Sequence, residues 1–408
     1  MSTILYLSYD GMTDPLGRSQ VLPYLVGLSR HGIRFHLISF EKQETFEKHR
    51  QAVEGIVSKA GIQWHPISYT KKPPILSTIW DIYRMERLAS QLIHKHGINA
   101  IHCRSYISGL VGMKLKRKYG LPFIFDIRGF WADERVEGGL WDLNQPVYKT
   151  VYAYFKKQEQ KMFDIADRIV SLTNRAAKII AEKHHATIEK IHVIPCCADL
   201  DHFNAKDTDR NQALNIQEKT GMGNHQPVLG YLGGIVTWYM LDEMFEFFKR
   251  LLVRYPNAYF LLITTEKPES IFQAARKIGV PTQHVGVFAA SREEVPAAIS
   301  LFDVSLFFIR PTYSKTASSP TKQGELMGMG IPIICNKGIG DTDHVINTYH
   351  CGDCIELNDP SAMDQAVAAF EQTMRIPKDR IRKGAEEFYA LDAGVAKYLS
   401  LYQSLGMV

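Results

Sequence analysis

Short apolar segments alternate with amphipathic segments along this sequence, and that alternation limits the fold more than any other feature. Apolar strands separated by helices are typical of parallel sheets that are covered by helices on both faces. In such doubly wound folds, ligands bind beyond the carboxyl ends of the strands. Residues that directly follow a predicted strand are therefore the candidates for function.

The strand pattern runs twice along the chain, with a polar, turn-rich connection around residues 196–212 between the two runs. The first run predicts strands over residues 3–9, 35–40, 100–105, 122–127, 168–173 and 191–195. The second run predicts strands over residues 228–233, 259–264, 284–288, 304–309, 332–336 and 354–357. A chain of 408 residues also exceeds what one hydrophobic core usually supports, so two domains are expected.

We predict an α/β fold made of two doubly wound, Rossmann-like domains that face each other across a cleft, where a ligand would bind. The predicted parts are an N-terminal domain over residues 1–198, a linker over 199–212, a C-terminal domain over 213–385 and a final helix over 386–408. The apolar residues of the last segment have helical spacing, so this helix either caps its own domain or crosses back to the first one.

Charge is unevenly distributed over a chain whose net charge is +5. Residues 1–200 contain 28 lysines and arginines against 19 acidic residues, a balance of +9, whereas the remainder has 20 against 24, a balance of −4. The basic half fits an anionic partner such as a membrane surface or a phosphorylated acceptor, or it is an ordinary lysine-rich surface. No nucleic-acid recognition motif accompanies the basic residues, so nucleic acid is not expected as a partner.

The sequence has the features of a cytoplasmic protein. No apolar run approaches the roughly 18 residues of a membrane span, and the start MSTILYLSYDG reads as a first strand rather than as a signal peptide. Six scattered cysteines give no disulfide framework and fit a reducing compartment. We expect a cytoplasmic chain, and the basic half leaves open a peripheral contact with the inner face of the membrane.

Residues 318–334, SSPTKQGELMGMGIPII, join a polar turn to a helix and then to an apolar strand. Ser318, Ser319 and Thr321 are candidates to cap the helix. The backbone N–H groups and the positive dipole end of a helix start suit phosphate. Lys322 in the first turn opposes the helix dipole unless an anion is bound there, and the alternative is a capped, solvated helix with a stray lysine.

Three further charged residues accompany this turn. Glu325 lies one helical turn beyond Thr321, where its carboxylate can accept hydrogen bonds from the hydroxyls of a ribose, and the alternative is an intrahelical pair with Lys322. Arg310 and Lys315 flank the same loop and would add positive charge to a phosphate site.

On these residues the chain resembles the GT-B fold glycosyltransferases of the retaining family 4 type, over essentially its whole length. In that family a glutamate, seven residues, a second glutamate and a G-x-P-V-I segment bind the nucleotide sugar, and ELMGMGIPII matches the second half. The resemblance implies that Glu325 holds the ribose hydroxyls and that SSPTK, which is similar to an S-P-T-K variant subgroup, approaches the diphosphate. The first glutamate of the pattern falls at Ala317, a departure that bears on the identity of the sugar.

Two matches lie in the N-terminal half. The segment YLSYDGMTDPLGRSQVLPYL places Gly17 after the first strand, where the resemblance implies a close approach of the backbone to the donor phosphates. The segment FDIRGFWADERVEGGLW combines aromatic rings with Asp126, Arg128 and Glu134, which suits a sugar site or a structural ion-pair cluster. Many relatives have a histidine where Arg128 lies, so the role of that histidine is not carried over.

A further match, LGYLGGIVTWYMLDEM, opens the second domain. It lacks the arginine and the lysine that neutralise the diphosphate in many relatives, so that this charge would have to come from Arg310, Lys315 or Lys322. Gly233 and Gly234 still permit a close backbone approach.

The resemblance implies a hexosyltransferase-type glycosyltransferase that moves a sugar from a nucleotide diphosphate sugar, UDP- or GDP-linked, to a saccharide or lipid-linked acceptor in surface polysaccharide synthesis, with retention of configuration. The nucleotide sugar is a substrate, so no cofactor is expected. No metal is expected either, because helix starts and basic side chains would handle the phosphate charge. The predicted donor-site residues are Gly17, Arg310, Lys315, Ser318, Ser319, Thr321, Lys322 and Glu325, and those predicted at the reacting centre are Asp126, Arg128 and Glu134.

Two other functions remain open on the sequence. A nucleotide-sugar epimerase of the same fold would use acid and base carboxylates of its own around the sugar. A sugar-nucleotide-binding protein without turnover would account for the missing glutamate at Ala317 and for the missing basic pair after Gly234. A nicotinamide enzyme is poorly supported, since no G-x-G-x-x-G follows a predicted strand.

Overall fold

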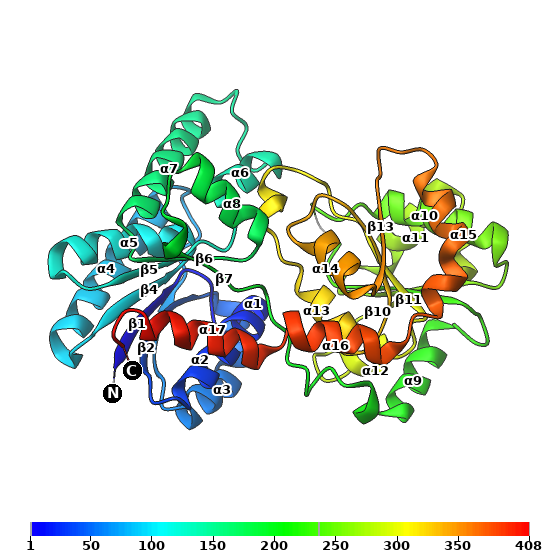
Figure 1. Cartoon of the computed structure of the whole chain (residues 1–408), viewed down its shortest axis with the longest axis horizontal. Coiled ribbons are helices and arrows are strands. Elements are labelled where there is room, and N and C mark those ends of the chain that lie inside the picture. Colours follow the sequence, from blue (N-terminus) through cyan, green and yellow to red (C-terminus); the bar gives the residue numbers. More distant parts are fainter. Residues whose placement is uncertain (1, 236, 408) are drawn as a thin grey trace. The chain divides into compact units, whose positions relative to one another are not determined.

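The computed structural model describes residues 2–235 and 237–407. The chain forms two compact units, the first made of Met1–Cys196 with Leu391–Val408 and the second of Cys197–Ala390 (Figure 1). Each unit is built on its own parallel sheet, with helices packed around it. The predicted fold class, two Rossmann-like domains of the GT-B type, is confirmed.

The sheet of the first unit has the strand order β3-β2-β1-β4-β5-β6-β7. Its central strands β1, β4 and β5 are buried along their whole length, as expected for strands covered on both faces. The strands are β1 (Thr3–Ser8), β2 (Arg34–Glu41), β3 (Gln63–Ser68), β4 (Ala100–Arg104), β5 (Phe123–Asp126), β6 (Arg168–Ser171) and β7 (Ile191–Val193).

Helices α4, α5 and α7 lie side by side on one face of this sheet, and α2, α3 and α17 cover the other (Figure 1). This division follows from the right-handed crossovers between parallel strands, because the strand order reverses its direction after β3. The helices are α1 (Pro15–Gln20), α2 (Leu22–Ser29), α3 (Gln43–Lys59), α4 (Leu76–His96), α5 (Ser105–Tyr119), α6 (Trp131–Glu137), α7 (Pro146–Ile165), α8 (Asn174–Lys183) and α17 (Leu391–Gln403).

The sheet of the second unit has the order β10-β9-β8-β11-β12-β13. Strand β8 contains Gly230 because the ring of Phe302 occupies the space of a side chain there, only 2.1 Å from where a Cβ atom would lie. The strands are β8 (Val228–Leu232), β9 (Tyr259–Ile263), β10 (Val285–Phe288), β11 (Val304–Phe307), β12 (Ile333–Asn336) and β13 (Gly352–Ile355).

Helix boundaries in the second unit follow local capping rules. For example, Asp209 accepts hydrogen bonds from the backbone N–H groups of Asn211 and Gln212 at the start of α9, and Gly221 ends that helix with a φ of +69°. The helices are α9 (Arg210–Thr220), α10 (Leu241–Arg254), α11 (Pro268–Ile278), α12 (Val295–Ile299), α13 (Thr321–Gly328), α14 (Thr342–Tyr349), α15 (Ala362–Met374) and α16 (Lys378–Phe388).

The strands predicted from the sequence all occur, with ends that shift by a few residues, but β3 was not predicted. This strand lies at the edge of the sheet, is largely exposed and contains Pro66. A proline is tolerated in an edge strand because one side of that strand needs no hydrogen-bond partner. Without a continuous apolar run, the segment carries no strand signal in the sequence.

The segment 199–212, predicted as a linker, belongs to the second unit. The guanidinium of Arg382 on α16 donates hydrogen bonds to the backbone carbonyls of Leu200, Phe203 and Gly328. This single side chain therefore ties the segment to the C-terminal end of α13.

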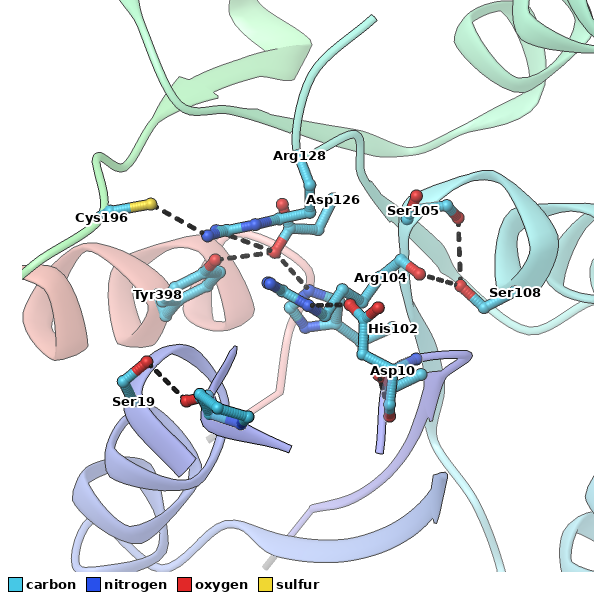
Figure 2. Close-up of polar contacts among 12 residues, drawn as sticks. Asp10, Ser19, His102, Arg104, Ser105, Ser108, Asp126, Arg128, Cys196 and Tyr398 are labelled. Carbon is cyan, nitrogen blue, oxygen red and sulfur yellow. Dashed lines mark hydrogen bonds and ion pairs between the residues drawn. The ribbon is translucent and has the colours of Figure 1, made fainter. Parts of the chain in front are cut away.

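The end of the chain forms two helices, α16 and α17, which are separated at Tyr389 and Ala390. Helix α17 crosses back to the first unit and packs on α2, where Val395 lies against Gly27. Its hydroxyl groups are bound too, because Tyr398 Oη donates to Asp126 Oδ2 at 2.9 Å (Figure 2) and Tyr402 Oη lies 2.7 Å from His102 Nδ1. Polar contacts as well as packing therefore hold α17 on the first unit.

Replacing Tyr398 by phenylalanine should lower the free energy of unfolding of the first unit by about 1.5–3 kcal/mol, the usual worth of a hydrogen bond to a charged group. The change removes only the hydroxyl that binds the buried Asp126 carboxylate. Chemical denaturation monitored by circular dichroism measures the loss, with Tyr83→Phe on the exposed side of α4 as the matched control. If Tyr398→Phe lowers the free energy of unfolding as little as Tyr83→Phe does, packing alone holds α17 on the first unit.

Candidate functional site

The loop after β11 returns to the carboxyl edge of the second sheet and leads into α13. A 3₁₀ turn over Ser314–Ala317 precedes the helix, which begins at Thr321. The helix has Pro320 at its N-cap position and no side-chain cap, so the predicted hydroxyl cap is not formed. Ser318 and Ser319 lie between this turn and the helix and are partly exposed.

Lys322 in the first turn of α13 is buried among aromatic rings. Its Nζ lies 3.7 Å from the ring centre of Tyr239 and 4.1 Å from that of Tyr231, and it donates a hydrogen bond to Tyr231 Oη at 3.1 Å. A Cβ atom built on Gly233 would lie 3.1 Å from the same Nζ. The lysine thus extends from α13 to the glycine turn that follows β8.

No carboxylate of the described residues lies within ion-pair distance of the Lys322 ammonium. The aromatic faces attract its positive charge, but burial disfavours the charged form. Burial holds the pKa of Lys322 well below its usual value, and Glu325 opposes that shift only in part. An anion close to Nζ would stabilise the ammonium.

Glu325 follows one turn later on α13 and is partly exposed. Burial of the carboxyl group raises the pKa of Glu325, while the charges of Arg292 and Lys322 lower it. Arg292 comes from the loop after β10, and its role was not predicted, because nothing in the sequence links that loop to α13. The structure therefore places two cationic side chains around one carboxylate.

The predicted basic residues of the loop differ in environment. Lys315 is buried, with its Nζ 3.7 Å from the ring centre of Trp238, whereas the side chain of Arg310 is exposed. The backbone N–H of Arg310 donates to the carbonyl of Trp238, and Tyr239 forms a bridge with Ile309. Trp238 and Tyr239 precede α10 and hold the two lysines rather than forming a helix face.

In the first unit, Asp126 and Arg128 form one buried network at the end of β5 (Figure 2). Arg128 Nη1 lies 3.8 Å from Asp126 Oδ2, and Arg128 Nη2 donates to Cys196 Sγ at 3.2 Å. Burial by itself would raise the pKa of Asp126, but Arg128 and His102 outweigh it and hold this pKa below its usual value. The carboxylate is therefore charged inside the unit.

The backbone at this edge of the first sheet is strained. Arg128 has a φ of +58° and Ser105, at the end of the neighbouring β4, has a φ of +67°. Non-glycine residues rarely adopt this left-handed conformation, and residues that do so cluster at functional sites. The roles of Asp126 and Arg128 at a reacting centre stay predictions, and the contacts add a positioning role toward α17.

Glu134 lies on α6, where it is partly exposed. Its neighbour Asp133 is the residue that enters an ion-pair cluster, accepting hydrogen bonds from Tyr152 Oη at 2.8 Å and from Lys156 Nζ at 2.9 Å. The structural ion-pair reading of this segment thus applies to Asp133, and the role of Glu134 stays a prediction.

Gly17 is required by the packing of its own loop. A Cβ atom at Gly17 would lie 2.1 Å from the carbonyl oxygen of Gly11, which no side chain allows. The loop is held by the buried Glu41, whose carboxylate accepts hydrogen bonds from the backbone N–H groups of Met12 and Thr13. The predicted approach of Gly17 to donor phosphates stays a prediction, and Glu41 was not predicted.

The sequence contains three Asp-x-Asp segments, at residues 199–201, 207–209 and 341–343, and the first two contribute to local structure. Asp199 accepts hydrogen bonds from the N–H groups of Asp201 and His202, and Asp209 caps α9. Within residues 2–235 and 237–407, no three histidine, cysteine or carboxylate side chains are grouped as metal ligands would be.

The fold is similar to that of solved glycosyltransferases. Two Rossmann-like units joined in this order are the GT-B architecture of glycosyltransferases. A glycosyltransferase from Rickettsia africae has a TM-score of 0.69 at 15% identity, with 99% of this chain and 98% of that chain covered. The Anabaena protein HepE, solved with UDP and glucose, has a TM-score of 0.68 at 13% identity, with 100% of both chains covered.

The sequence comparisons give partial matches to one family. A family model described as Glycosyltransferase Family 4 matches residues 23–202. A D-inositol 3-phosphate glycosyltransferase from Mycobacterium ulcerans is 21% identical over 270 residues, which cover 62% of this chain and 54% of the relative. A D-inositol 3-phosphate glycosyltransferase from Mycolicibacterium smegmatis is 19% identical over 302 residues, which cover 69% of this chain and 65% of the relative. The chain thus spans about half to two thirds of the length of these curated relatives. The likeness to family 4 is therefore partial and lies mainly in the first unit.

Replacing Lys322 by methionine should raise the free energy of unfolding near neutral pH by about 1–3 kcal/mol, because a buried charge without an ionic partner is lost. A lysine whose pKa is lowered on folding binds more protons in the unfolded state, so the stability of the wild-type chain rises with pH between the two pKa values. The advantage of the variant should therefore shrink as the pH approaches the ordinary pKa of lysine.

Thermal unfolding of both chains across this pH range measures the effect. The titratable groups that face Lys322 are Glu325, Tyr231 and Tyr239. Burial raises the pKa of all three, that of Tyr239 to about 12. Lys206→Met at an exposed position is the control. A Lys322→Met chain that is less stable than wild type at every pH would contradict the assignment of a destabilising charge.

Proposed function

We propose that the chain transfers a sugar from a nucleotide diphosphate sugar to an acceptor, with the diphosphate bound at the start of α13. The observation that carries this proposal is Lys322, a buried ammonium beside the backbone of Gly233 without a carboxylate partner among the described residues. Oxygens of a diphosphate would supply the missing anion, and the start of a helix adds N–H donors. The Anabaena relatives solved with UDP and with UDP-glucose support a UDP sugar as the first donor to test, ahead of a GDP sugar.

Each residue around α13 has a proposed part in donor binding. Glu325 accepts hydrogen bonds from the ribose hydroxyls, and the charge of Arg292 opposes the rise in the pKa of Glu325 that burial causes. Lys315 and the exposed Arg310 add positive charge on the same loop, and the partly exposed hydroxyls of Ser318, Ser319 and Thr321 are further donors.

In the proposed reaction, the bond between the anomeric carbon and the diphosphate oxygen breaks while the acceptor hydroxyl attacks. The cations and the start of α13 stabilise the charge that develops on the diphosphate. The leaving diphosphate accepts the proton of the acceptor hydroxyl, and the configuration at the anomeric carbon is retained. The first unit binds the acceptor, with Asp126, Arg128 and Glu134 near the reacting centre.

The proposed acceptor is a saccharide or a lipid-linked glycan of surface polysaccharide synthesis, presented at the inner face of a membrane. The basic balance of residues 1–200 supports an anionic or membrane-bound acceptor. The curated relatives are named for a phosphorylated cyclic polyol, which makes a polyol phosphate the second acceptor class to test.

Calorimetry with uridine, UMP and UDP, and with the guanosine series, tests the donor site. Lys322→Ala should weaken UDP or GDP binding by about 10–100-fold and nucleoside binding hardly at all, because one charged hydrogen bond to phosphate is worth about 1.5–3 kcal/mol. Glu325→Gln should weaken all members of the preferred series alike, since the ribose is common to them. Lys206→Ala serves as the control, and unchanged UDP and GDP affinity in Lys322→Ala would refute the proposed site.

A binding protein without turnover is the second candidate, and Ala317 is the observation in its favour. This residue is buried in the 3₁₀ turn, where the family pattern has its first glutamate, so the side chain that contacts the sugar is missing. Incubation of the chain with the preferred nucleotide sugar separates the candidates. Transfer to an acceptor or slow hydrolysis indicates a transferase, epimer formation without acceptor indicates an epimerase, and binding without any product indicates a binding protein.

A further inference from the structure

Helix α4 has two apolar faces, and only one of them is covered. The buried face consists of Ser77, Asp81, Met85, Ala89 and Leu92. A second set of residues at helical spacing, here called the apolar stripe, is exposed over the first two turns. The apolar stripe consists of Leu76, Ile79, Trp80 and Tyr83, whose exposed fractions are 64%, 57%, 53% and 52%.

The apolar stripe continues into a groove between α4, α5 and α7, which lie side by side (Figure 1). Leu110 and Met113 of α5 line the groove, and Tyr154 of α7, which is half exposed, lies on its far side. Contiguous exposed apolar surface of this kind is uncommon on a soluble chain and marks an interaction site.

The loop before α4 presents one more apolar side chain between positive charges. Ile75 is exposed and has a φ of +69°, a costly conformation for a β-branched residue. Lys71 and Lys72 in the same loop are exposed, and so is Arg117 at the rim of the groove. A strained backbone that exposes an isoleucine to solvent indicates that this side chain has a function at the surface.

We propose that the apolar stripe and its flanking basic residues dock the first unit on an anionic lipid surface. Trp80 and Tyr83 stack with ring centres 5.6 Å apart and combine apolar rings with polar tips, which suits the headgroup level of a bilayer. Lys71, Lys72 and Arg117 provide the attraction to anionic headgroups. Shallow insertion and charge together give the two signals that reversible membrane binding requires.

This binding mode fits the secondary structure. Across residues 2–235 and 237–407, no helix combines the length and the hydropathy that crossing a bilayer requires. The helix carries its apolar stripe only at its N-terminal end, so α4 would lie against the surface with its opposite face still packed on the sheet. Docking of this kind needs no rearrangement of the first unit.

Sedimentation of the full chain with vesicles tests the proposal. Wild type should bind vesicles that contain phosphatidylglycerol, and bind vesicles of pure phosphatidylcholine much more weakly. The double variants Leu76→Ser/Ile79→Ser and Lys71→Gln/Lys72→Gln should each weaken binding to the anionic vesicles by about tenfold or more. Added salt should reduce wild-type binding, because it screens the lysines.

Matched controls come from the second unit. Leu214→Ser/Val253→Ser removes two exposed apolar residues and Lys206→Gln/Lys249→Gln two exposed lysines, and both variants should bind vesicles as wild type does. Brominated lipids should quench the fluorescence of wild type more than that of Trp80→Phe. The proposal is overturned if wild type does not bind anionic vesicles, or if the control variants lose as much binding as the test variants. It is also overturned if wild type self-associates without lipid and Leu76→Ser/Ile79→Ser abolishes that self-association. None of these readouts depends on transferase activity.

Discussion

A charged side chain can be buried only where other groups replace its hydration, and this requirement governs the carboxyl edges of both sheets. Parallel strands bring their carboxyl ends to one edge, so polar residues that follow different strands meet there. In the first unit the buried carboxylate of Asp126 has a cationic partner in Arg128 and a hydrogen-bond donor in the hydroxyl of Tyr398. In the second unit Lys322 has aromatic rings and one phenol instead.

The rings around Lys322, in place of a carboxylate, would favour the proposed binding of a diphosphate. A carboxylate paired with Lys322 would compete with the proposed diphosphate for the ammonium. Tyr231 and Tyr239 fix the position of the ammonium without cancelling its charge. We expect this arrangement to lower the stability of the free chain, as in other preorganised sites.

The repeated alternation of strands and helices was enough to predict the fold class, because it reflects two independently buried parallel sheets. Edge strand β3 could not be predicted, since Pro66 and its polar neighbours give no buried run. The sequence also brought attention to Lys322 and Glu325 through their position at a helix start. It could not reveal Tyr231, Arg292 or Glu41, whose parts in the sites depend on contacts between segments far apart in the chain. The spacing of apolar residues indicates which face of a single helix or strand is buried, whereas a site is formed by side chains from several elements.

Helix α4 is a second case in which the sequence pattern does not determine the contacts. Its apolar residues fit a helix, but periodicity alone does not say which of two apolar faces the sheet will cover. The structure decides this through Met85, Ala89 and Leu92, which turn inward and leave Trp80 and Tyr83 outside. Because α17 and its partner Asp126 are engaged on the other face and at the edge of the sheet, a surface that meets the apolar stripe does not compete with them. Lipid contact through α4 and the buried network around Asp126 can therefore vary independently of each other.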